Sequence, residues 1–248
     1  VDKTGSTNGR NATWRLDVNA AQSTVDSIEI VDVLSANQVL NADSIKVFEA
    51  TIDPANKHEL AKGDLVEITE NEKPYTYTVD GNTLNLTIHG VVDKPYIVEY
   101  QSFVLAASGE EIQNTVSVSG DQLLTLSGGK NSEYKKAFAI ASAGASADAI
   151  KKGTLQIKKV AAHTGDPLEG VVFEATFEQD PQLPETDANA GKMETYTVRA
   201  VTDEQGIATF TGLPYGEVDV TEIETLKGYV LNSTTSTITI DQEAEELE

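Results

Sequence analysis

Apolar and polar residues alternate along short segments through most of this chain. Between Thr13 and Asn19, for example, Trp14, Leu16 and Val18 alternate with polar residues. A period of two is typical of a strand with one buried face, and no segment keeps a helical period. The first half is predicted to contain the strands Thr13–Asn19, Ser27–Val33, Ser44–Thr51, Leu65–Thr69, Tyr75–Val79, Thr83–His89, Tyr96–Ser102 and Gln113–Ser119.

A second series of strands follows a segment of different composition. Ser127–Gly153 is rich in Ala, Ser and Gly, and its later part is expected to be a connector. The segment Glu178–Lys192, with two prolines and several acids, is expected to be an exposed loop insertion. The second series comprises Thr154–Val160, Val171–Phe177, Glu194–Ala200, Ile207–Phe210, Glu217–Ile223 and Thr235–Ile240.

The pattern predicts an all-β protein of two immunoglobulin-like antiparallel β-sandwich domains in tandem. We place the boundary near Ile150, so that the domains are residues 1–150 and 151–248. A length of 248 residues suits two domains that each bury a core.

Charge and composition exclude several classes of function. The net charge is −22, which would repel a nucleic acid backbone or an anionic membrane surface. No apolar stretch approaches the roughly 20 residues of a membrane span. The chain has no cysteine, so disulfides, thiolate chemistry and cysteine-bound zinc are excluded.

Five motifs follow one another in the second half of the chain. They are Gly153–Val160, Pro167–Phe173, Thr202–Gly206, Leu213–Glu217 and Val220–Tyr229. In this order they closely resemble the Cna-B domain of Gram-positive pilins and adhesins, over Gly153 to about Ile240. In that family a first-strand lysine condenses with a last-strand asparagine, promoted by a buried glutamate. The resemblance implies Lys159 as the lysine and Glu222 as the glutamate.

The acceptor asparagine of this second domain is missing. The family's last strand should follow Thr235–Ile240, but residues 242–248 contain no asparagine, and Asn232 precedes that segment. We therefore expect a domain that lacks its last strand. Either the chain continues beyond Glu248, or another chain supplies the strand by edge addition.

The first half contains an ordered set of motifs of its own. They are Val1–Gly5, Thr13–Asn19, Ile30–Leu34, Asp43–Val47, Tyr96–Tyr100 and Gln113–Gly120. From Val1 to about Gly120 the chain resembles the collagen-adhesin A-region type of sandwich found in Gram-positive adhesins. In that type a first-strand lysine bonds to a late-strand asparagine beside an aspartate. The resemblance implies Lys3, Asn114 and Asp32 in these roles.

The implied chemistry is physically sensible. Burial disfavours a charged lysine and lowers its pKa, which frees an amine for attack. Burial also raises the pKa of a carboxyl group, which can then donate a hydrogen bond to the asparagine carbonyl and move protons. Such a bond forms once, so we expect no enzyme in the usual sense. A lysine or an acid in a strand is usually solvated, so the family pattern is what favours these core roles.

No other constellation competes with these two sites. His58, His89 and His163 are far apart in sequence, so no metal site or cofactor is expected. Composition alone could supply a Ser-His-Asp site, but there is no nucleophile-elbow motif and no phosphate-binding loop.

The leading functional hypothesis is an extracellular stalk or backbone segment of a cell-wall-anchored adhesin or pilus, with neighbouring subunits as partners. A binding module for a host matrix protein or a glycan is the alternative. A non-catalytic domain of a secreted enzyme is a third.

Overall fold

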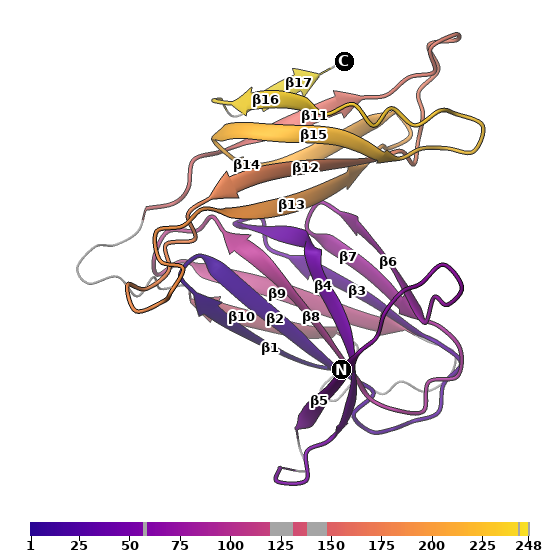
Figure 1. Cartoon of the computed structure of the whole chain (residues 1–248), viewed down its shortest axis with the longest axis vertical. Helices are drawn as coiled ribbons and strands as arrows, with labels where there is room; N and C mark the ends of the chain where they lie inside the picture. The colour runs from indigo at the N-terminus through magenta and orange to yellow at the C-terminus, as the bar shows by residue number, and fades with distance from the viewer. Residues whose placement is uncertain (57–58, 120–130, 138–147, 243, 248) are drawn as a thin grey trace.

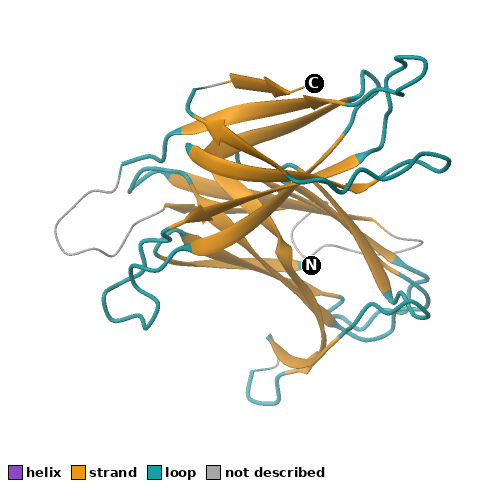
Figure 2. Cartoon of the chain, turned by 45° about the horizontal axis from the view of Figure 1, so that its top comes forward, coloured by secondary structure: helices purple, strands orange, loops and turns teal. Residues whose placement is uncertain are grey.

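The chain consists of strands and loops. The computed structural model describes residues 1–56, 59–119, 131–137, 148–242 and 244–247, with 131–137 and 244–247 described by their backbone. Within these ranges there is no helix, as Figure 2 shows. The prediction of an all-β protein with two tandem immunoglobulin-like domains is confirmed.

The first domain is built from two five-stranded antiparallel sheets. The first sheet has the order β1 (Asp2–Asn8), β2 (Asn11–Val18), β8 (Tyr96–Val104), β4 (Gln38–Ile52) and β5 (Leu60–Leu65). The second sheet has the order β10 (Asn131–Ala137), β9 (Glu111–Ser119), β3 (Ile28–Leu34), β7 (Thr83–Ile88) and β6 (Tyr75–Asp80).

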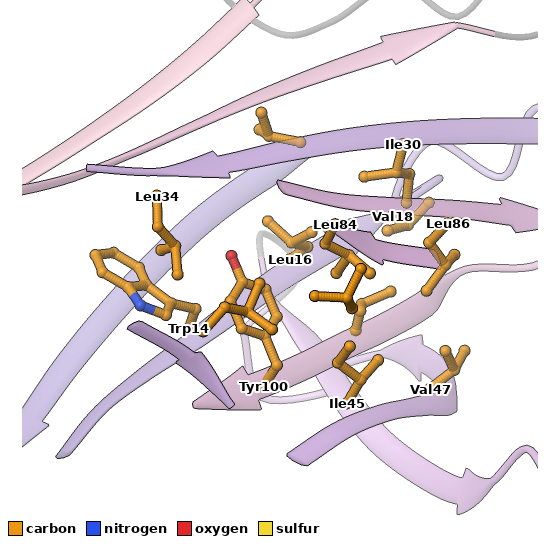
Figure 3. Packing of buried hydrophobic residues seen from close by; sticks show 14 of the residues in the cluster. Trp14, Leu16, Val18, Ile30, Leu34, Ile45, Val47, Leu84, Leu86 and Tyr100 are labelled. Carbon is orange, nitrogen blue, oxygen red and sulfur yellow. The ribbon is translucent and has the colours of Figure 1, made fainter. Parts of the chain in front are cut away.

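Alternation along the strands builds the core between these two sheets. Trp14, Leu16 and Val18 of β2 are buried, while Arg15 and Asp17 between them reach solvent. Figure 3 shows these apolar side chains packed against residues of the opposite sheet. The indole N–H of Trp14 donates to the Ser102 hydroxyl at 3.0 Å, which satisfies its buried polar atom.

One strand prediction in this domain is wrong. Leu65–Thr69 was expected to be a strand, but β5 ends at Leu65. The pairing of β5 with the long strand β4 decides its position: Ile52 lies opposite Leu60, and the ladder continues to Phe48 opposite Leu65. Local composition cannot reveal that register, because it depends on the partner strand.

The second domain has a three-stranded and a four-stranded sheet. The first has the order β14 (Ile207–Pro214), β11 (Lys152–Lys158) and β17 (Ala244–Leu247). The second has the order β13 (Glu194–Val201), β12 (Val172–Gln179), β15 (Gly216–Glu224) and β16 (Ser236–Ile240).

The expectation that this domain lacks its last strand is wrong. The acidic segment Ala244–Leu247 forms β17, which pairs in parallel with β11 and places Leu247 opposite Ile157. Its composition gave no strand signal, because glutamates are depleted in strands. The edge of β11 supplies hydrogen-bond partners for the backbone of this segment, and this pairing makes it a strand despite its low strand propensity.

The two domains meet along β13, which lies on the side of the second domain that faces the first (Figure 1). Phe103 and Leu105 of the first domain belong to the buried apolar cluster of the second. The Phe103 ring lies 4.8 Å from that of Tyr196 and 6.2 Å from that of Phe177, measured between centroids. The junction therefore contains an apolar core of its own. Most of the expected connector, residues 138–147, lies outside the described residues.

Candidate functional site

Three strands bring Lys3, Asp32 and Asn114 together in the core of the first domain. Lys3 lies on β1 at the edge of one sheet, and Asp32 and Asn114 lie on the neighbouring strands β3 and β9 of the other. Asp32 pairs with Val116 and Asn114 with Leu34, so the two polar residues are diagonal neighbours on the inward face. Both have no exposed surface, and the Lys3 side chain has none either.

A continuous chain of hydrogen bonds joins these residues through a fourth, Tyr100. The Lys3 ammonium donates to Asp32 Oδ1. The Tyr100 hydroxyl donates to Asp32 Oδ2 at 2.5 Å and accepts from Asn114 Nδ2 at 2.5 Å. The carbonyl oxygen of Asn114, Oδ1, is buried and has no hydrogen-bond partner among the described residues. Asn114 Oδ1 can therefore accept a hydrogen bond from an acid while an amine attacks the amide carbon.

Tyr100 is the residue that sequence reasoning missed. It comes from β8 in the sheet that also holds Lys3, and Figure 3 shows its hydroxyl pointing away from its own strand, between the two sheets. Alternation along Tyr96–Tyr100 could have marked it as inward-facing. A buried tyrosine hydroxyl needs a polar partner, which would have directed attention to the buried polar groups nearby.

Burial shifts the pKa of each of the three ionisable groups in the direction that favours its neutral form. It lowers the pKa of Lys3 from 10.5 to about 8, although the neighbouring Asp32 carboxylate opposes this. It raises the pKa of Asp32, against the effects of Lys3, Tyr100 and Asn114. It also raises the pKa of Tyr100 well above 10.0, so this hydroxyl remains a donor. Burial thus favours a neutral amine beside a neutral acid.

The second domain brings Lys159 and Glu222 together as its resemblance implied. Lys159 follows β11, and its ammonium lies 2.6 Å from Glu222 Oε2 on β15. The Lys159 side chain is 24% exposed, whereas that of Glu222 is 3% exposed. Glu222 Oε1 is buried without a hydrogen-bond partner among the described residues. Solvent therefore reaches the lysine of this pair, whereas the Lys3 site is closed.

An open groove of about 260 Å³ lies over this pair and includes Asn232 in its lining. Asn232 is exposed, and its Oδ1 accepts a hydrogen bond from the Thr234 amide at 3.2 Å. It therefore lies at the mouth of the groove, in a loop and not on the strand where the family places its acceptor. The new strand β17 contains no asparagine. Sequence reasoning is thus wrong about the missing strand, and the acceptor asparagine of this domain stays unassigned.

A second groove, of about 420 Å³, lies between the domains on the outer face of the first sheet. Its lining is mostly hydroxyl, amide and charged side chains from β2, β4 and β8, and it is roofed by β13. The residues are Thr13, Asn41, Asp43, Ser44, Lys46, Glu99, Tyr100, Gln101, Thr195 and Thr197. Among the described residues, no three histidine or acidic side chains gather as metal ligands would.

Two family models match the chain and together cover both domains. The collagen binding domain model matches residues 1–127, and the prealbumin-like fold domain model matches residues 153–248. The first match covers half of the chain. This chain belongs to the collagen binding domain family. Its second domain is a prealbumin-like fold domain of the kind that the second model describes.

Solved structures with a similar fold come from Gram-positive bacteria. The T6 backbone pilin of Streptococcus pyogenes is 17% identical, with 97% of this chain and 51% of that one covered and a TM-score of 0.36. The group B streptococcus pilus 2b backbone protein is 18% identical over 99% and 96%, with a TM-score of 0.37. The collagen-binding domain of a Staphylococcus aureus adhesin is 16% identical over 54% and 93%, with a TM-score of 0.40.

These distant likenesses concern the fold alone. The chain spans about half the length of the T6 pilin. No curated protein matches the chain. In the portion of the chain that the structure describes, no helix combines the length and the apolar character needed to cross a membrane.

The depressed pKa of Lys3 can be measured in an Asn114→Ala chain, in which the lysine stays free. NMR titration of its side chain should give a pKa near 8, against an ordinary value of about 10.4. Because the folded state then holds fewer protons than the unfolded state between these values, the free energy of unfolding should rise with pH across this window. An ordinary pKa for Lys3 would contradict the burial argument.

Proposed function

We propose that this chain is a structural stalk or backbone segment of a Gram-positive cell-surface adhesin or pilus, with its first domain stabilised by a self-formed Lys3–Asn114 isopeptide bond. The buried cluster of Lys3, Asp32, Tyr100 and Asn114 carries this proposal. The two family matches support a surface protein of the pilus and adhesin class. The chain would then work outside the cell, attached to the wall through segments beyond those described.

The bond would form by a single condensation. Asp32 takes the proton of Lys3, and the neutral amine attacks Cγ of Asn114, while the Asp32 acid donates its hydrogen to the unpartnered Asn114 Oδ1. Collapse of the tetrahedral intermediate expels the amide nitrogen as ammonia, and Asp32 moves the protons this requires. The Nζ–Cγ bond replaces the Cγ–Nδ2 bond. Nζ gives up two protons in all: one completes the ammonia and the other leaves with it as ammonium, so Asp32 ends as the carboxylate that it was at the start.

Tyr100 would be the positioning residue of this reaction. Its hydroxyl joins Asp32 to Asn114, so it fixes the acid and the amide relative to each other. The fold thereby meets the entropy cost of bringing amine and amide into contact before the reaction starts. Since the product is part of the chain, the protein reacts once and is not a turnover enzyme.

The position of the bond suits a protein that bears tension. Among the described strands, β1 lies at the edge of the first sheet beside β2, and it contains the N-terminal residues. Force applied at the N-terminus would therefore peel β1 first. A bond from Lys3 to Asn114 would fasten β1 to β9 in the opposite sheet. Local opening, the route to proteolysis and to mechanical failure, would then require a covalent bond to break.

A ligand-binding adhesin module is the second candidate. The polar groove between the domains and the match to the collagen binding domain model favour it. Its hydroxyl and amide groups could hydrogen-bond an extended peptide or a glycan. The two functions are compatible, because the groove lies on the outer face of the sheet and the Lys3 site lies beneath it.

The intact mass of the purified chain tests the cross-link. We expect it to be lower than the sequence mass by one ammonia, because the described residues join a lysine, an acid and an amide by hydrogen bonds in the first domain and show no such chain in the second. Lys3→Ala, Asn114→Ala and Asp32→Ala should each restore the sequence mass. Lys159→Ala serves as the matched control and should leave the loss unchanged.

A full sequence mass in the parent chain would refute the cross-link. A loss that persists in Asp32→Ala would refute the role given to this carboxyl group. Tyr100→Phe should slow the reaction without abolishing it, since the phenyl ring keeps the packing but loses both hydrogen bonds.

The pH dependence of bond formation follows from the shared proton. The reactive pair of Lys3 and Asp32 holds one proton between them, as amine and acid. The rate of ammonia loss after refolding should therefore rise with pH through the raised pKa of Asp32 and fall above about pH 8, where Lys3 gives up that proton. A rate that climbs steadily to pH 10 would show that a free amine suffices and that Asp32 need not be an acid.

Binding to immobilised fibrillar collagen tests the second candidate. If the groove is the site, the chain should bind saturably and Lys46→Glu, which reverses a charge in the groove lining, should weaken binding several-fold. Lys73→Glu, at an exposed position outside the groove, is the control. Absence of saturable binding, or equal effects of the two variants, would count against this groove as a collagen site.

A further inference from the structure

The loop predicted to be an exposed insertion in the second domain is docked on the first domain. Pro181 is buried, and its carbonyl accepts a hydrogen bond from the Arg10 amide at 2.5 Å. Gly9, at the turn between β1 and β2, has a φ of +56°, and a Cβ there would lie 2.3 Å from the Pro181 oxygen. Only a glycine permits this approach, so the turn and the loop fit each other closely.

Arg10 is the centre of this contact. Arg10 is 1% exposed, and its guanidinium donates hydrogen bonds to groups from three separate segments. Nη1 donates to the Val104 and Ala106 carbonyls at 2.9 Å, at the end of β8. Nη2 donates to the Asp148 carbonyl at 2.6 Å, just before the second domain, and Nε donates to Gln182 Oε1 of the docked loop at 2.9 Å.

Further hydrogen bonds surround the arginine. Asn11 donates to Glu194 at 2.9 Å and accepts from the Tyr196 hydroxyl at 2.7 Å, and Asn8 donates to Asp187 at 3.0 Å. The cluster of Phe103, Phe177 and Tyr196 lies alongside. Domain junctions within one chain are usually polar and allow relative motion. Here a buried cation, matched carbonyls and an aromatic core all favour a single orientation.

We propose that Arg10 and the loop between β12 and β13, residues 180–193, form an interdomain lock that holds the two domains in one orientation. Separation of the domains would break the hydrogen bonds of Arg10 to Gln182 and to the Pro181 carbonyl and would expose the aromatic cluster to water, so it is disfavoured. The lock acts without the Lys3–Asn114 bond and does not depend on it. The chain then behaves as one rigid body and not as two beads on a hinge.

Spin labels test the lock directly, because the chain has no native cysteine. Asp64→Cys in the first domain and Lys227→Cys in the second place labels at exposed sites. The labelled parent should give a narrow distance distribution, and adding Arg10→Ala should broaden it at least twofold. Arg15→Ala, an arginine on the same sheet that pairs with Asp17, is the matched control and should leave the width unchanged. Equal widths in all three chains would overturn the proposal.

A gentler variant keeps the test decisive if Arg10→Ala does not fold. Gln182→Ala removes one partner of the guanidinium from the loop side and leaves the first domain intact. Gln182→Ala should also broaden the distance distribution. A second measurement uses Gln182→Ala, Arg10→Gln and the double variant: the decrease in melting temperature of the double variant should differ from the sum of the two single decreases. All measurements are repeated with Lys3→Ala, which removes the cross-link. A narrow distribution in Gln182→Ala with additive effects would overturn the lock.

Discussion

The burial of an ammonium and a carboxyl group between two sheets is the constraint on which the first domain depends. Lys3 and Asp32 have no exposed side-chain surface, and an unpaired charge at either position would be costly. Removing one partner of such a pair typically costs about 3–5 kcal/mol. While Lys3 stays ionic, its buried pair with Asp32 is weak support for stability. An amide bond from Lys3 to Asn114 would instead join the two sheets covalently, and the geometry around Tyr100 and Asn114 supports that proposal.

The second domain repeats the arrangement with one element changed. Its lysine and glutamate also come from opposite sheets, but Lys159 follows its strand, where solvent reaches it. The groove over the pair and the unpartnered Glu222 Oε1 mark the place where a further polar group would complete the site. The two sites are thus unequal: in the described residues, the first is closed around its amide, whereas the second is partly open to solvent, with Asn232 in the lining of the groove above it.

The junction between the domains is formed by contacts that the sequence does not predict. Its contacts come from the β1–β2 turn, the end of β8 and the loop before β13, which are far apart in the sequence. None of them carries a local signal of contact. Pro181 and Gln182 have the composition of a surface loop, and Arg10 follows a glycine in a turn, where a solvated arginine is the ordinary expectation. Their burial follows from the way the two domains pack.

The sequence by itself determined the all-β class, the two domains, and the pairing of Lys3 with Asp32 and of Lys159 with Glu222. Strand alternation is a local property with a period of two, and the family motifs identify positions one by one. Only the tertiary structure decided the role of Tyr100, the existence of β17 and the docking of the loop onto Arg10. Each of these depends on a partner distant in the sequence: an opposite sheet, the free edge of β11, or another domain. Local propensity carries no information about such partners, because the contacts exist only after the chain has folded.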